Sequence, residues 1–171
     1  MKIITENQFT KAAFFSMLKE NNTAKDISEQ NDIIILDGDL GFFYIIRKSE
    51  MVSVFELSAF EAFIHLQKFA FNKRKEREEL LKYIKRGCFL VGGTFPKEIS
   101  EKEKLILGLM FEGLTVKTIS NLTKLSEKRV SAHKISALNK FGERRISDLV
   151  YRYQYFKFFY ERISIDTLSL K

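Results

Sequence analysis

Basic side chains are concentrated in one stretch of the C-terminal half of the chain, from Lys117 to Arg145. The stretch holds eight basic residues and only two acidic ones, Glu127 and Glu143. Ammonium and guanidinium groups bind phosphate and carboxylate oxygens, so this density indicates a polyanionic partner. A solvated helical face would carry the same charges, so charge alone leaves both interpretations open. The basic residues are Lys117, Lys124, Lys128, Arg129, Lys134, Lys140, Arg144 and Arg145.

The same asymmetry is present in the whole chain of 171 residues, whose net charge is +7. Residues 1–95 hold 14 Lys and Arg against 13 Asp and Glu, a net charge of +1. Residues 96–171 hold 15 against 9, a net charge of +6. A nucleic acid, an acidic membrane surface or an acidic protein would each be attracted to the second half.

Residues that would support catalysis or metal binding are sparse in the sequence. The chain has one cysteine, Cys88, and two histidines, His65 and His133, too few for an intrachain disulfide or a cysteine-based zinc site. The sequence has no phosphate-binding glycine loop and no recognisable nucleophile–base pair. We therefore expect no enzyme activity, no bound metal and no cofactor.

Composition indicates a folded protein outside the membrane. Hydrophobic residues make up 45% of the chain and charged residues 30%, which is typical of globular domains. No apolar run approaches the roughly 18 residues that span a bilayer. The N-terminus lacks the basic and apolar regions of a secretion signal. We expect a cytoplasmic protein with no membrane partner.

The elements that position the basic residues begin after a break in the chain. Residues 92–98 include a Gly-Gly pair and the only proline, which predicts a linker. Ser100 and Glu103 then form a capping-box pattern at the start of a helix. Thr115 and Ser126 can cap a second and a third helix. The region after the linker is therefore predicted to be all-helical.

The third predicted helix, residues 126–141, has two different sides. Val130, Ala137 and Leu138 fall on one side and are expected to pack, whereas Ser131 and Ile135 project elsewhere. A tight turn separates this helix from the one before it. Two helices joined in this way are typical of a helix-turn-helix, whose second helix enters the major groove of DNA.

Residues 99–150 resemble the LuxR/FixJ-type DNA-binding domain, and the match runs without gaps. It is carried by apolar, glycine and polar positions at the spacing of that family. The matching positions are Ser100, Glu103, Glu112, Gly113, Leu114, Lys117, Ile119, Ser126, Val130, His133, Leu138, Lys140, Gly142 and Leu149. The resemblance implies a four-helix domain that binds duplex DNA, usually as a dimer, in bacterial transcription control.

The resemblance also implies roles for individual residues. Ser131, Ala132 and Ile135 fall where the family reads base edges. A further set falls where the family holds the phosphate backbone: Thr115, Lys117, Lys128, Arg129, His133 and Lys140. Because Ile135 can contact only a thymine methyl and Ser131 discriminates little, specificity is expected to depend also on Arg129, Lys134 or DNA shape.

Two positions depart from the family pattern at the turn. Thr123 stands where an apolar core residue is usual, and Lys124 stands where Gly or Asn is frequent. Both departures bear on how tightly the turn can close.

Residues 1–91 alternate apolar runs with amphipathic stretches, which predicts a small α/β domain with a mainly parallel sheet. The run at residues 33–36 predicts a buried strand, and residues 51–57 and 62–66 are weaker strand candidates. Residues 78–87 predict a helix that ends at a glycine.

This half more faintly resembles a phosphorylation receiver domain. Asp37 falls at the phosphate-accepting position, Ser58 at the switch position and Lys68 at the conserved lysine. Thr5, however, replaces one of the two acidic residues that hold Mg²⁺ in receivers. Ser58 and Lys68 are also too close in sequence for a helix and a strand between them. We therefore predict a truncated pseudo-receiver without phosphate uptake. The alternative for Asp37 is a turn-forming residue after a strand, a role that an Asp-Gly pair fills on its own.

Residues 151–171 form an extension rich in aromatic residues. Seven aromatic side chains within residues 151–160 would cover every face of a helix. We predict a dimerisation helix that uses Tyr153, Phe156 and Tyr160, because aromatic residues are enriched in interface cores. Packing against the N-terminal domain is the alternative.

Together these patterns predict a bacterial transcription regulator that binds double-stranded DNA as a dimer, without control by receiver phosphorylation. The subunits of the dimer could be identical, or one could be another regulator. Two alternatives stay open. One is a protein-interaction antagonist that pairs with another regulator, and the other is a phosphorylation-switched response regulator. A DNA-binding regulator of this kind is expected in the cytoplasm, associated with the nucleoid through its DNA binding.

Overall fold

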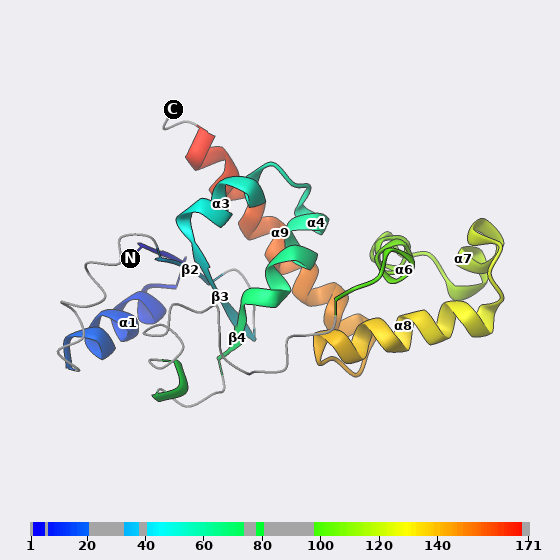
Figure 1. Ribbon diagram of the computed structural model, residues 1–171, viewed down its shortest axis with the longest axis horizontal. Helices are drawn as coiled ribbons and strands as arrows, with labels where there is room; N and C mark the ends of the chain where they lie inside the picture. The colour runs from blue at the N-terminus through cyan, green and yellow to red at the C-terminus, as the bar shows by residue number, and fades with distance from the viewer. Residues whose placement is uncertain are drawn as a thin grey trace. The chain divides into compact units, whose positions relative to one another are not determined.

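The computed structural model describes residues 2–5, 7–20, 33–37, 41–73, 78–80 and 98–168. The chain divides into two compact units. Unit 1 comprises residues 1–93 with 155–171, and unit 2 comprises residues 94–154. One helix, α9 (Ile146–Leu168), contributes its first part to unit 2 and the remainder to unit 1 (Figure 1). Most of the predicted linker and of the predicted helix over residues 78–87 lies outside the described residues.

Unit 1 is built on a four-stranded sheet with the order β1–β2–β3–β4. The strands are β1 (Lys2–Thr5), β2 (Ile33–Asp37), β3 (Phe42–Arg47) and β4 (Ala70–Asn72). β1 and β2 are parallel, whereas β3 is antiparallel to both β2 and β4. The prediction of a mainly parallel sheet is therefore wrong. Residues 38–41 are the whole connection from β2 to β3, which is too short for the crossover of a dozen or more residues that parallel strands need.

Helices flank these strands along the chain: α1 (Gln8–Glu20), α3 (Lys48–Phe55), α4 (Ala59–Leu66) and the single 3-10 turn η1 (Gln67–Phe69). The two weaker strand predictions, residues 51–57 and 62–66, are wrong because both segments are mainly helical. A capping box starts α4: the backbone N–H of Glu61 donates to Ser58 Oγ, and the Ser58 N–H donates to Glu61 Oε2. Ser58, predicted as a switch residue, thus caps a helix.

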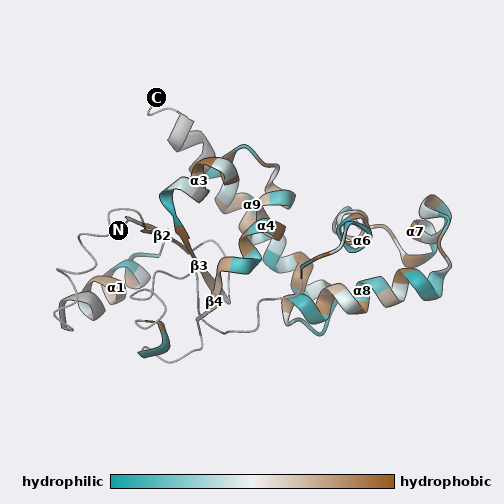
Figure 2. Ribbon diagram, viewed as in Figure 1, coloured by the Kyte–Doolittle hydropathy of each residue, from teal (hydrophilic) through white to brown (hydrophobic). Residues whose placement is uncertain are grey.

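The core of unit 1 lies on the central strands, which are among the most hydrophobic parts of the chain (Figure 2). All five residues of β2 are buried, and Tyr44, Ile45 and Ile46 of β3 have no exposed surface. A strand buried in this way reads in sequence as a continuous apolar run, and this explains why residues 33–36 were predictable.

The C-terminal part of α9 belongs to this core. The Phe156 ring packs edge-on against Tyr44, with centroids 5.7 Å apart, and lies 5.3 Å from the Phe63 ring. The Tyr160 hydroxyl donates to the carbonyl oxygens of Val54 and Leu57, at 2.6 and 2.9 Å. These bonds satisfy carbonyl groups at the end of α3 that have few partners within the helix.

Unit 2 consists of α6 (Glu101–Phe111), α7 (Val116–Thr123), α8 (Glu127–Phe141) and the first part of α9. Its core is formed by Ile106, Met110, Ile119 and Val130, with partly buried apolar side chains around them. Each of α6, α7 and α8 begins at the capping residue predicted from the sequence: Ser100, Thr115 and Ser126. No helix in the described part of the chain is long and apolar enough to cross a membrane.

Candidate nucleic-acid interface

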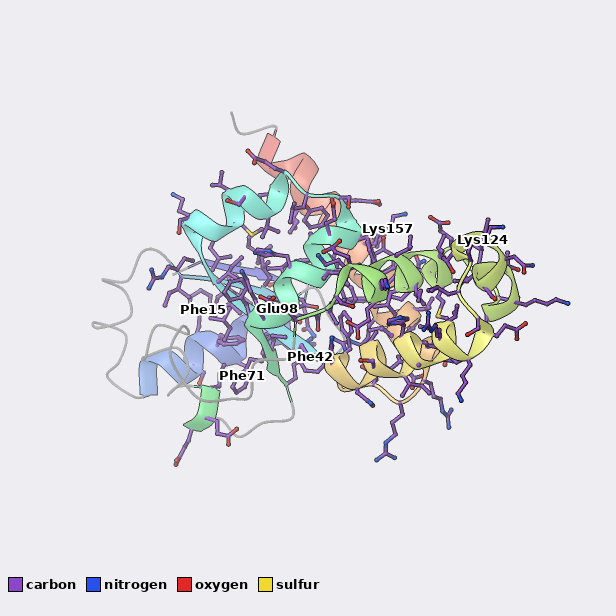
Figure 3. All side chains as sticks on the ribbon, turned by 45° about the vertical axis from the view of Figure 1, so that its right-hand side comes forward. Phe15, Phe42, Phe71, Glu98, Lys124 and Lys157 are labelled. Atoms are coloured by element: carbon purple, nitrogen blue, oxygen red, sulfur yellow. The ribbon has the colours of Figure 1, made fainter. Side chains whose placement is uncertain are left out.

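Helices α7 and α8 are joined by a turn of three residues, 124–126. Thr123 and Lys124 depart from the family pattern here, but their conformation and hydrogen bonds still allow the turn to close. Lys124 lies in this turn (Figure 3). It adopts the left-handed conformation, with φ 57°, and so provides the bend that Gly or Asn would otherwise provide. The Thr123 hydroxyl donates to the Ile119 carbonyl at 2.7 Å. The Ser120 hydroxyl donates across the turn to the Leu125 carbonyl at 2.6 Å. The turn closes because its polar groups are paired.

Helix α8 presents a well-defined outer row to solvent. Lys128, Ala132, Ile135 and Asn139 are all exposed, and 55% of the Ile135 surface is accessible. At about 100° of rotation per residue, these four positions fall within an arc of roughly 60°. The buried residues Val130, Ala137, Leu138 and Phe141 occupy the opposite side. We call the four exposed positions the outer row.

The predicted base-reading residues all lie on or beside the outer row. Ala132 and Ile135 belong to it, and Ser131 is half-buried at its edge. Ile135 presents an exposed apolar side chain, and the methyl group of thymine is an apolar contact that suits it.

The predicted phosphate contacts divide into those that are accessible and those that are not. Lys117, Lys128 and Arg129 are exposed, and they have no ion-pair partner among the described residues. Thr115 is also exposed, but its hydroxyl caps α7 by accepting from the Thr118 N–H at 3.2 Å. His133 is half-buried.

Lys134 lies on a different side of α8 from the predicted base-reading residues. It is four residues from both Val130 and Leu138, so it follows the line of buried positions, and it is itself half-buried. Its side chain therefore projects away from the outer row, and the prediction that Lys134 supplies specificity there is not supported by its position.

Lys140 is engaged inside unit 2. Its ammonium group donates to Glu103 Oε2 at 2.6 Å and to the Glu98 carbonyl at 2.7 Å. The two side chains of the ion pair are 16% and 4% exposed for Lys140 and Glu103 respectively. This pairing does not support the prediction that Lys140 holds a DNA phosphate, because the lysine neutralises a buried carboxylate and joins α8 to α6.

The Glu103 carboxyl is strongly perturbed by its surroundings. Burial raises the pKa of Glu103, but hydrogen bonds from Lys140, Ser136 and Ser100 outweigh that effect and lower the pKa from 4.5 to about 2. Glu103 is thus ionised at neutral pH and depends on Lys140 for its charge balance.

A second internal ion pair was not predicted from the sequence. The guanidinium of Arg152 is buried, and it donates to Glu143 Oε1 at 2.7 Å and to the Phe141 carbonyl at 3.4 Å. The nine-residue separation of Arg152 and Glu143 spans the junction of α8 and α9, so no helical spacing rule would have found it. The pair neutralises Glu143, which is one of the two acidic residues between Lys117 and Arg145.

Asp37, the predicted phosphate acceptor, is buried in unit 1 and already paired. Its Oδ1 accepts from the ammonium of Lys73 at 2.5 Å, and its Oδ2 accepts from the Thr5 hydroxyl at 2.8 Å. The lysine that meets Asp37 is thus Lys73, which follows β4. Lys68, the residue predicted to match the conserved lysine, lies over the ring of Phe69 at 4.7 Å from its centroid.

The three residues predicted to form a dimer interface are buried within the chain. Tyr153 stacks on Phe111 within unit 2, with centroids 4.6 Å apart, and Phe156 and Tyr160 pack within unit 1. Phe156 and Tyr160 thus pack against residues of the N-terminal half, which was the alternative, whereas Tyr153 packs on α6. The burial of these three side chains does not support their use in a dimer interface. Dimerisation itself stays a prediction.

Comparison with known proteins identifies the domain that carries this geometry. Residues 97–152 match the GerE family model, described as "Bacterial regulatory proteins, luxR family". No curated protein and no solved structure matches the chain. The match covers the helix-turn-helix, the outer row and the first part of α9. Such a domain implies DNA binding and transcription regulation. Residues 97–152 are a LuxR-family helix-turn-helix domain.

Proposed function

We propose that this protein is a bacterial transcription regulator that binds duplex DNA as a dimer, with the outer row of α8 in the major groove. The observation that carries the proposal is the exposure of the outer row, which begins at Lys128, together with the accessible cations Lys117 on α7 and Arg129 on α8. Small and apolar side chains at the centre of the row permit close approach to base edges. Lys117, Lys128 and Arg129 bind sugar-phosphate strands. Binding to DNA places the protein in the cytoplasm.

The proposal is tested by the salt dependence of DNA affinity. Among the predicted phosphate contacts, three accessible cations per chain give six in a dimer, which predicts a slope of log affinity against log salt of about −5. Fluorescence anisotropy with labelled duplex DNA measures this slope. Lys128→Ala should reduce its magnitude by about 2 in a dimer, whereas Lys102→Ala, a change at an exposed lysine of α6, should leave it unchanged. A flat salt response, or no binding at low salt, refutes the proposal.

The proposed dimer requires a surface other than the three buried aromatic residues. On α9, Tyr151, Tyr155 and Phe158 are 66%, 42% and 61% exposed, and their spacing of four and three residues places them along one side of the helix. Sedimentation of the wild type and of Phe158→Glu tests this surface. A dimer that persists unchanged in the variant contradicts it. Sedimentation alone does not distinguish an identical partner from another regulator, so a pull-down from cells accompanies it.

We further propose that regulation does not use phosphorylation of Asp37. An acceptor carboxylate must be open to the phosphodonor, whereas this one is buried and bonded to both Lys73 and Thr5. Incubation with a small phosphodonor followed by intact-mass measurement tests the proposal. A mass increase of one phosphoryl group that is lost in Asp37→Asn would instead favour a phosphorylation-switched response regulator.

An antagonist that pairs with another regulator is the second candidate function. It is favoured by the scarcity of polar groups at the predicted reading positions, since Ala132 and Ile135 have no polar side-chain atom and Ser131 is half-buried. Co-purification with a regulator, without retention on DNA by the protein alone, would support it over the leading proposal.

A further inference from the structure

The outer row of α8 extends one helical turn beyond the residues assigned to base reading. Asn139 is exposed and lies four residues after Ile135 and seven after Ala132. At about 100° per residue it falls between Lys128 and Ala132 in angle, nearer the middle of the row than Ser131 or Ile135. Any groove that receives Ala132 and Ile135 therefore also faces Asn139, provided the helix lies along it.

The side chain of Asn139 is available for recognition. Its backbone carbonyl accepts from the Gly142 N–H at 3.2 Å in the cap of α8, but its side-chain amide has no hydrogen-bond partner among the described residues. The polar side chains next to it on the helix, in contrast, already have hydrogen-bond partners. Ser136 and Lys140 both bind the carboxylate of Glu103. Asn139 is thus the one amide on the exposed surface of α8.

We propose that Asn139 is a specificity-determining residue that selects an A·T base pair in the major groove. An asparagine amide donates one hydrogen bond and accepts another, and this pair of bonds matches N7 and N6–H of adenine. The inference rests on the proposed DNA-binding function and adds an amide that can make two hydrogen bonds to one base, which Ser131, Ala132 and Ile135 cannot.

The helix geometry also predicts where the selected base lies. Ile135 and Asn139 are separated by a rise of about 6 Å along α8, which corresponds to roughly two base pairs of B-DNA. A binding site should therefore contain an A·T pair read by Asn139 about two steps from the thymine whose methyl group meets Ile135.

The experiment selects binding sites from a randomised duplex library with the full-length wild type and with Asn139→Ala. Affinities are then measured for the selected site and for versions with each base pair changed. In the wild type, changing the A·T pair read by Asn139 should weaken binding about 10-fold, within the range of a bidentate base contact. In Asn139→Ala that penalty should fall to nearly nothing, while the other positions keep theirs.

A matched control is Gln154→Ala, which removes an exposed amide from α9 and should leave every preference unchanged. Equal weakening of all sequences by Asn139→Ala would make the residue a backbone contact and overturn the inference. Unchanged preferences in Asn139→Ala would overturn it too. Both outcomes leave the proposed function standing, whereas failure of the wild type to bind any duplex overturns both.

Discussion

Removing the ammonium group of Lys140 should destabilise unit 2 rather than act on DNA directly. Lys140→Met retains most of the aliphatic stem but leaves the carboxylate of Glu103 buried without its cation. Lys128→Met is the matched control, because Lys128 is on the same helix, is exposed and has no ion-pair partner among the described residues.

The size of the effect follows from the pKa of Glu103. A decrease from 4.5 to about 2 corresponds to about 3 kcal/mol of stabilisation at neutral pH. Ser100 and Ser136 contribute part of this and remain in the variant, so we expect Lys140→Met to lower the free energy of unfolding by about 2 kcal/mol. The contribution is fully present above pH 4.5 and is lost as the pH falls through about 2.

Hydrogen exchange of backbone amides in α6 and α8 measures this free energy in the full-length protein. Lys140→Met should increase exchange roughly 30-fold at neutral pH, which corresponds to about 2 kcal/mol. Lys128→Met should leave it within about twofold. The double variant Lys140→Met/Glu103→Gln should regain part of the lost stability, because no buried charge is left unpaired. Unchanged exchange in Lys140→Met, together with a loss of DNA affinity like that of Lys128→Met, would refute the reasoning and restore Lys140 as a phosphate contact.

Three other substitutions test the folds of the two units. Lys124→Gly should raise the free energy of unfolding of unit 2 by about 1 kcal/mol, since Lys124 has a φ of 57° that glycine adopts without strain; a fall in that free energy measured in urea contradicts this. Tyr160→Phe should lower the stability of unit 1 by about 1–2 kcal/mol through loss of both hydroxyl hydrogen bonds, and an unchanged urea midpoint contradicts it. Lys73→Met should cost about 3 kcal/mol by leaving Asp37 buried without its cation; equal thermal unfolding of variant and wild type would show that the pair contributes nothing.

Unit 2 was predictable because its signals are local. The capping residues Ser100, Thr115 and Ser126 each precede a run with helical period, and all three begin helices in the structure. The burial of Val130, Ala137 and Leu138 also follows from spacing within one helix. Such signals depend only on neighbours along the chain, so no tertiary information was needed.

The errors arose where partners are far apart in sequence. Lys140 meets Glu103 across 37 residues, and nothing near Lys140 distinguishes it from a free surface lysine. Tyr160 donates to carbonyl groups that are more than 100 residues away in sequence. Nothing within the aromatic extension indicates these partners, so its side chains were predicted to meet a second subunit, although several are buried within the chain. In unit 1, strand direction is set by connections and pairing rather than by the apolar runs themselves.

The central claim is that the outer row of α8 enters the DNA groove, and a single substitution at its centre tests it. Ala132→Glu places a negative charge on an exposed helical position where glutamate is well tolerated, so unit 2 should keep its fold. Leu105→Glu adds the same charge at a position of α6 that is 54% exposed. In anisotropy measurements of duplex affinity, we expect Ala132→Glu to abolish binding and Leu105→Glu to reduce it only slightly. Equal affinities of the Ala132→Glu variant and the wild type would contradict the account.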